Sequence, residues 1–163
     1  MESSRNLEPA LAGEVAAALE RLFGVFRRLS PPDGLSLTAA ATLATLERSG
    51  PQRLTALAVR EGVTQPAMTQ LIGRLQDGGL VGRAADPADG RVVQVRLTDL
   101  GRDTLARRRA IRADRLAAIL ARISPEDRAA LDAALPAIDA LTSAERDGEP
   151  PAASSSGRAA QFA

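Results

Sequence analysis

The spacing of apolar residues changes partway along the chain, and this change restricts the fold more than any other feature. In residues 7–79 the apolar positions recur with a helical period, whereas residues 80–85 and 91–97 alternate as strands do. Residues 86–90 contain Pro, Asp and Gly, which favour a turn between the two strands. A helical pattern then returns over residues 98–146. This order predicts a mainly α-helical chain with one small β-hairpin.

Start and stop residues divide the helical regions into six segments. Ser and Thr caps, Pro in a first turn and Gly after a last turn mark the ends of these segments. We expect helices over residues 7–29, 37–49, 54–60, 64–77, 98–121 and 124–146. Three short helices followed by a hairpin are typical of a winged helix-turn-helix domain. We therefore predict a flexible N-terminus (1–6), an N-terminal dimerisation helix with its connector (7–34), the winged domain (35–101), C-terminal dimerisation helices (102–146) and a disordered tail (147–163).

The composition excludes most catalytic chemistry. The 163 residues include no cysteine and no histidine, so disulfides, thiolate zinc sites and the usual proton shuttles are missing. We expect no enzyme activity, no metal and no cofactor. No apolar run approaches the roughly 20 residues that span a bilayer, and the N-terminus does not resemble a secretion signal. These features predict a cytoplasmic protein without a membrane partner, associated with the nucleoid.

The net charge of +1 conceals an uneven distribution along the chain. Residues 48–115 carry thirteen Arg against seven acids, whereas both flanking regions are acidic. The basic middle coincides with the predicted winged domain, which indicates a polyanionic partner there. All 21 basic residues are Arg, whose guanidinium group suits contacts with phosphate and guanine.

The predicted fourth helix has the surface that a DNA-reading helix requires. Met68, Leu71, Ile72 and Leu75 form its apolar inner stripe. The opposite face carries small, amide and basic side chains that can reach base edges and phosphates, although a plain amphipathic surface helix has the same periodicity. The candidate DNA-binding residues on this helix are Thr64, Gln65, Pro66, Thr69, Gln70 and Arg74.

The hairpin supplies further candidate DNA contacts. Arg83 lies on its first strand, and Arg91 stands at its tip beside Asp89 and Gly90. A tip arginine can enter the narrow minor groove, and Asp89 could orient it through a hydrogen bond. Arg53 is a candidate flanking contact. The alternative is an ordinary Asp-Gly turn with a solvated arginine.

The region from Leu37 to Gly101 resembles the MarR (multiple antibiotic resistance regulator) family of transcription factors. Several spaced motifs carry this resemblance in the right order: Leu37-Thr38, Leu57-Ala58, Val63-Thr64-Gln65-Pro66-Ala67-Met68-Thr69, Gly79-Leu80-Val81 with Arg83, Asp86-Pro87 with Asp89 and Arg91, and Val95 with Leu97-Thr98 and Gly101. Two positions depart from the family pattern. The tip reads Asp89-Gly90-Arg91 rather than Asp-Arg-Arg, and Gln76 follows Leu75 where Glu is common.

The resemblance implies a homodimer built from the terminal helices, and the apolar stripes on those helices agree with it. The alternative is that the first and last helices pack on each other within one chain. A two-fold dimer implies a pseudo-palindromic operator on double-stranded DNA. The candidate dimerisation residues are Leu19, Leu22, Leu131, Leu135, Ile138 and Leu141.

The resemblance also implies a cleft for a small organic effector between the dimerisation helices and the winged domain. An anionic or lipophilic ligand would suit the residues available, although the two phenylalanines could instead fill core or interface. The candidate lining residues are Phe23, Phe26, Arg27, Leu43 and Leu46. The basic run Arg107-Arg108-Arg109, with Arg112 and Arg115, is interpreted as a solvated helix surface with salt bridges.

These observations predict a sequence-specific DNA-binding transcriptional regulator, a dimeric repressor that a small ligand releases. Two alternatives from other classes stay open. One is an architectural protein that binds DNA without reading its sequence, for which more basic residues would be expected on the fourth helix. The other is a winged-helix interaction module that has lost DNA binding, against which Arg83 and Arg91 argue.

Overall fold

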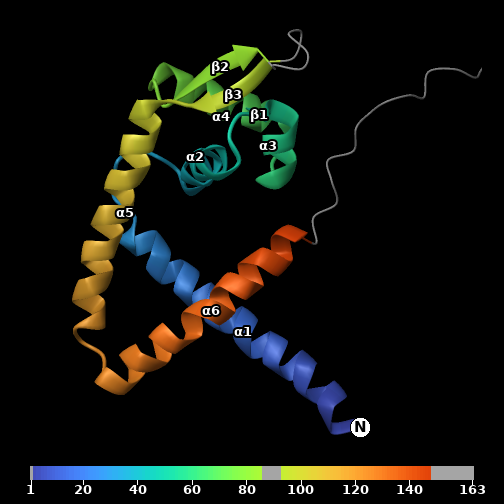
Figure 1. Cartoon of the computed structure of the whole chain (residues 1–163), viewed down its shortest axis with the longest axis vertical. Helices are drawn as coiled ribbons and strands as arrows, with labels where there is room; N and C mark the ends of the chain where they lie inside the picture. Colours follow the sequence, from blue (N-terminus) through green and yellow to red (C-terminus); the bar gives the residue numbers. More distant parts are fainter. Residues whose placement is uncertain (1, 86–92, 148–163) are drawn as a thin grey trace, which may run out of the picture.

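The computed structural model describes residues 2–85 and 93–147, with the side chains of residues 9–85 and 93–144. In chain order the elements are α1 (Glu2–Leu29), α2 (Leu37–Ser49), β1 (Gln52–Arg53), α3 (Leu54–Arg60), α4 (Gln65–Asp77), β2 (Val81–Ala85), β3 (Val93–Leu97), α5 (Asp99–Leu120) and α6 (Pro125–Asp147), as drawn in Figure 1. The predicted fold class, a mainly helical winged helix-turn-helix with flanking helices, is confirmed. The expected turn at residues 86–90 lies outside the described residues. Of the tail expected over residues 147–163, Asp147 belongs to α6 and residues 148–163 lie outside the described residues.

Helices α2, α3 and α4 and the small sheet enclose one hydrophobic core, which we call the reading head (residues 35–97). Each helix contributes the apolar stripe that its period predicts, and β2 and β3 contribute alternate residues. Leu105, from the second turn of α5, completes this core. The most deeply buried apolar side chains are Leu43, Leu46, Leu57, Met68, Ile72 and Leu105, each at most 2% exposed.

Local capping explains where the reading-head helices begin. The Ser36 hydroxyl accepts a hydrogen bond from the Ala39 amide at the start of α2, and the Thr64 hydroxyl does the same for Ala67 in α4. The Thr98 hydroxyl accepts from the Gly101 amide at the start of α5. All three caps satisfy backbone donors that a first helical turn leaves free.

The sheet has three antiparallel strands in the order β1-β3-β2. Val81 pairs with Leu97 and Arg83 pairs with Val95 across β2 and β3. The two-residue strand β1 pairs Gln52 with Val95, which the sequence pattern did not predict. Two residues are too few for a visible alternation, so only the pairing with β3 identifies this strand.

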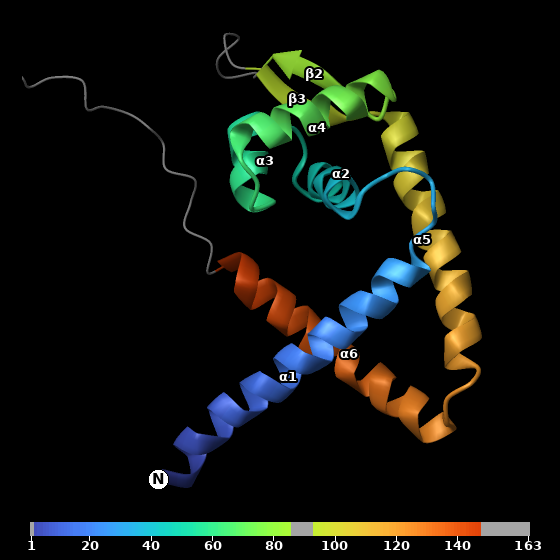
Figure 2. The same cartoon turned by 180° about the vertical axis from the view of Figure 1, so that it is seen from behind.

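Helix α5 connects the reading head to the rest of the molecule (Figure 1). Its first turns pack on the head, and its remainder extends away from it to meet α1 and then α6 (Figure 2). Helix α1 begins at Glu2, five residues before the expected start at Leu7. The apolar stripe that marked this helix begins only after its first turn, so periodicity gave no signal for the earlier residues.

Candidate DNA-binding surface

Helix α4 presents one buried and one exposed face. Met68, Leu71, Ile72 and Leu75 are buried in the core, as their spacing predicts. All six candidate residues on this helix and its cap are exposed: Thr64, Gln65, Pro66, Thr69, Gln70 and Arg74. The structure therefore brings them together on one surface, with Gln70 and Thr69 in the middle of the helix. Their contact with DNA stays a prediction.

The side chains of this surface change along α4, from groups that suit bases to groups that suit phosphate. The Thr69 hydroxyl donates to the Gln65 carbonyl at 2.9 Å, so its donor is used within the helix while its methyl group remains on the exposed side chain. Such a methyl suits contact with the thymine methyl in the major groove. Near the other end, Arg74 lines a hollow of about 190 Å³ with Ser36 and Thr38, next to the start of α2. Hydroxyl and guanidinium groups in this arrangement suit a phosphate.

The wing strand β2 places Arg83 beside α4. The Nε atom of Arg83 donates to Oε1 of Gln76 at 3.1 Å, so the guanidinium is tied to the last full turn of α4. Sequence reasoning noted Gln76 only as a departure from a pattern and missed this contact. Arg53, on β1, is exposed and pairs through its backbone with Gln94 of β3. Asp89, Gly90 and Arg91 lie outside the described residues.

The candidate cleft residues are not brought together within the chain. Leu43 and Leu46 are buried in the core of the reading head, because α2 is enclosed by the other head elements. Phe23 and Phe26 lie on α1 and line a shallow apolar hollow of about 520 Å³ with Leu19 and Leu22. Arg27 lines a separate hollow with Gly24 and Arg28. A shared cleft lined by all five predicted residues is therefore absent from the described part of the chain.

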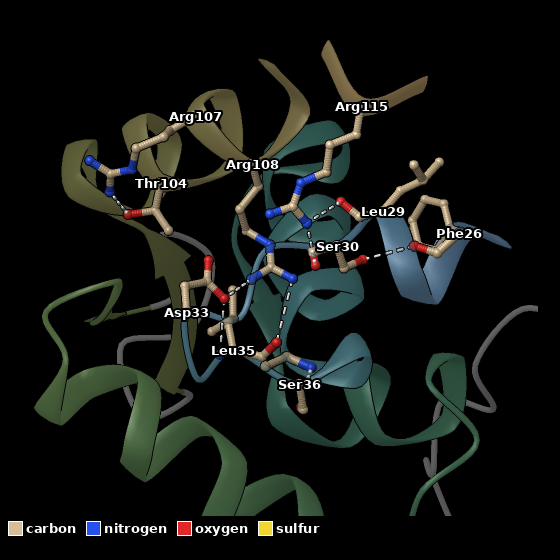
Figure 3. Close-up of polar contacts among 11 residues, drawn as sticks. Phe26, Leu29, Ser30, Asp33, Leu35, Ser36, Thr104, Arg107, Arg108 and Arg115 are labelled. Atoms are coloured by element: carbon tan, nitrogen blue, oxygen red, sulfur yellow. Dashed lines mark hydrogen bonds and ion pairs between the residues drawn. The ribbon is translucent and has the colours of Figure 1, made fainter. Parts of the chain in front are cut away.

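The basic run of α5 is not a uniformly solvated surface, which corrects the expectation from sequence. Arg108 is 1% exposed and forms an ion pair with Asp33 (Figure 3). Arg109 pairs with Glu47 of α2, and the exposed Arg107 donates to Thr104. The signal was available in the spacing: Arg108 falls seven residues after the buried Gly101 and three after Leu105, on the inner face of α5.

The other two arginines of this run contact the end of α1 and the residue that follows it. The guanidinium carbon of Arg112 lies 4.7 Å from the centre of the Phe26 ring, a cation–π arrangement. Burial, followed by the charges of Arg108 and Arg109, lowers the pKa of Arg112 from its usual value. Nη1 of Arg115 donates to the carbonyls of Leu29 and Ser30 at 3.1 and 3.0 Å.

Neither a metal cluster nor a membrane span is found in the part of the chain that the structure describes. No three or more acidic side chains gather there in a way that could hold a metal ion. None of the described helices is long and apolar enough to cross a bilayer.

Comparison with known proteins places this surface in a family. The model of the MarR family matches residues 35–93. An HTH-type transcriptional regulator of Mycobacterium bovis is 36% identical over 118 residues, which cover 72% of this chain and 82% of the relative. A Bacillus subtilis HTH-type regulator is 33% identical over 101 residues, covering 62% of this chain and 66% of that protein.

Solved structures give the same result for the fold. A transcriptional regulator from Pseudomonas aeruginosa superposes with a TM-score of 0.72 at 27% identity, covering 85% of this chain and 96% of the other. The Mycobacterium tuberculosis protein RV1404 superposes with a TM-score of 0.69 at 27% identity, covering 87% and 97%. Both matches extend beyond the reading head to include flanking helices.

Proposed function

Because this chain belongs to the MarR family of DNA-binding transcriptional regulators, we propose that it acts as a homodimeric repressor at a pseudo-palindromic operator. The sequence-based prediction of a regulator rather than an enzyme is confirmed by the family match and by the relatives. Repression, dimerisation and the operator form are our proposal. Its expected location is the cytoplasm, in association with the nucleoid.

One observation supports sequence-specific reading above all: the exposed face of α4 carries amides and hydroxyls rather than a row of cations. Gln65, Thr69 and Gln70 are exposed there, with Arg74 as the one basic residue of this helix. Amide side chains discriminate base edges, whereas a non-specific architectural protein relies on charge. In the proposal, α4 enters the major groove, and Arg83 and Arg91 contact the flanking backbone or minor groove.

The exposed apolar residues of the terminal helices support a dimer. Leu19 and Leu22 of α1 and Leu131, Leu135, Ile138 and Leu141 of α6 are each 46–54% exposed. Packing of these helices on each other within one chain would bury the stripes, and they are not buried. Apolar surface of this extent suggests a partner, and a second copy supplies the same stripes.

Ligand release belongs to the same proposal. Phe26, held against Arg112 between α1 and α5, supports an anionic or lipophilic organic effector, since an aromatic face next to a cation suits an aromatic acid. Benzoate is a suitable first probe. A ligand releases DNA only if it binds the two states of the dimer with different affinity.

Genomic footprinting with the purified protein tests the repressor proposal. We expect protected sites with two inverted half-sites about one helical turn apart. Protection spread evenly over all sequences would instead identify an architectural protein, and no protection would identify an interaction module.

Light scattering tests the dimer. We expect twice the chain mass of 17.0 kDa at micromolar concentration, and a lower mass for Leu135→Asp on the exposed face of α6. Val59→Asp is the matched control, because Val59 is also an exposed apolar residue but lies on α3 in the reading head. A wild-type mass near that of one chain would refute the dimer.

A further inference from the structure

The connector between α1 and α2 (residues 30–36) is held by α5 rather than by the reading head alone. The Arg108 guanidinium forms an ion pair with Asp33, and its Nη2 atom donates to the Leu35 carbonyl at 3.4 Å (Figure 3). The Asp33 carboxylate also accepts from the Leu35 amide at 3.2 Å. Arg115 holds the preceding residues through the Leu29 and Ser30 carbonyls. The connector is thus attached to α5 at two separate points.

These contacts lie where the two parts of the molecule join. The part of α5 before Arg108 belongs to the reading head, since Leu105 is buried in the core of that head. Beyond Arg108, toward its C-terminal end, α5 extends beside the end of α1, where Arg112 faces the Phe26 ring. Two segments of the chain therefore connect the reading head to the terminal helices: helix α5 and the connector. Arg108 links one to the other.

Because Arg108 is buried, breaking its ion pair with Asp33 costs free energy. Arg108 is almost fully buried, and a buried guanidinium without its carboxylate would keep the cost of dehydration and lose its counter-charge. The Nε atom of Arg108 has no hydrogen-bond partner among the described residues, so Asp33 and the Leu35 carbonyl carry its polar contacts. The pair consequently favours one position of the connector against α5.

We propose that Arg108 and Asp33 are positioning residues for DNA binding: they fix the reading head against the dimerisation helices, and so set the separation of the two α4 helices in the dimer. This inference rests on the proposed dimer. Two heads on one operator bind with high avidity only when their separation matches the half-sites, because the second contact then becomes intramolecular. Loss of the pair therefore weakens binding to two half-sites and leaves each single head intact.

The neighbouring arginines provide a matched pair of variants. Arg108→Met removes the link, whereas Arg107→Met makes the same chemical change one residue away on the exposed face. Asp33→Asn is a second, milder variant that keeps the side-chain size and removes the charge. It decides the question if Arg108→Met does not fold.

Affinity is measured on the full operator found by footprinting and on a duplex with one half-site. For Arg108→Met and Asp33→Asn we expect roughly a tenfold or greater loss on the full operator and less than a twofold change on the half-site. Arg107→Met is expected to match the wild type on both. Equal losses on both duplexes, or no loss on either, would overturn the proposal.

The separation of the heads is measured directly by electron spin resonance between two labels in the dimer. The chain has no cysteine, so Asp77→Cys at the exposed end of α4 introduces one label per protomer. We expect a narrow distance distribution with Arg107→Met and a broadened or shifted one with Arg108→Met or Asp33→Asn. Identical distributions would refute the positioning role, while a wild type that gives no distance because it is monomeric would refute the dimer instead.

Discussion

Single side chains on α4 differ in what they contribute to DNA binding. Gln70 is exposed in the middle of the helix and carries an amide that can bond two positions on one base. We expect Gln70→Ala to cost about 1–3 kcal/mol on the cognate operator and little on random DNA. Titrations of both DNAs by fluorescence anisotropy check this. Equal weakening on all sequences would show that Gln70 does not read bases.

The pair formed by Gln76 and Arg83 makes a second residue-scale prediction. Gln76 orients Arg83 without neutralising it, because its amide is uncharged. We expect Gln76→Met to weaken operator binding with the salt dependence unchanged, and to have no effect when Arg83→Ala is also present. Gln76→Glu and Arg83→Ala should each reduce the slope of log affinity against log salt by about one to two per dimer.

A double-mutant cycle at several salt concentrations measures these effects. If Gln76→Met weakened binding equally with and without Arg83, the contact would have no part in positioning the wing. If Arg83→Ala left both affinity and slope unchanged, Arg83 would not belong to the DNA-binding surface.

At the scale of elements, the junction between the wing and α5 leaves no room for a side chain at Gly101. A Cβ atom there would lie 2.3 Å from the Leu80 carbonyl oxygen and 2.6 Å from Cδ1 of Leu97. The Leu80 oxygen is itself held by the amide and hydroxyl of Thr98 at 3.1 and 3.0 Å, so it cannot shift freely. The junction is therefore closely packed.

We expect Gly101→Ala to lower the free energy of unfolding by about 1–3 kcal/mol, since overpacking forces a backbone shift. Gly73→Ala in α4 is the matched control, because nothing lies within 4 Å of a Cβ at that position. Urea unfolding without DNA compares the two variants. Equal stability of both would contradict the close approach at Gly101.

The ion pair between Asp33 of the connector and Arg108 predicts that the free energy of unfolding depends on pH. Partial burial raises the pKa of Asp33, but the hydrogen bond and charge of Arg108 and the Leu35 amide outweigh it, so the pKa lies below its usual value. A lowered pKa stabilises the fold above the unfolded value of about 4, and this contribution is lost as pH falls through the folded value.

We therefore expect the difference in unfolding free energy between wild type and Asp33→Asn to be constant above about pH 5 and to shrink below about pH 4. Urea titrations of both proteins between pH 3 and 7 test this, and the difference removes the contribution of the other carboxylates. A difference that grew on acidification would reverse the sign assigned to Asp33.

For the whole molecule, the amino-acid composition predicts that oxidation does not switch DNA binding. With no cysteine in the chain, and with Met68 fully buried, peroxide has no accessible sulfur in the described reading head. We expect brief peroxide treatment to leave operator affinity unchanged, as measured by anisotropy titration before and after. A large loss of affinity that a thiol reductant reverses would contradict this expectation.

The sequence by itself determined the architecture of the reading head. Caps at Ser36, Thr64 and Thr98, glycines after helices and the change of hydrophobic period act between residues close in the chain. Each signal is therefore complete within a short stretch of sequence. The same patterns placed the exposed surface of α4 correctly, because a helix with four buried residues at helical spacing has only one remaining face.

Only the tertiary structure decided which distant residues meet. Arg108 and Asp33 are 75 positions apart. The spacing within α5 places Arg108 on the inner face of that helix, but nothing local identifies Asp33 as its partner. Leu43 and Leu46 belong to the core and not to a cleft because α3, α4 and α5 enclose α2. Such contacts depend on how whole elements approach one another. Charge, period and capping along the chain do not specify that approach, because each contact depends on the relative placement of separate elements.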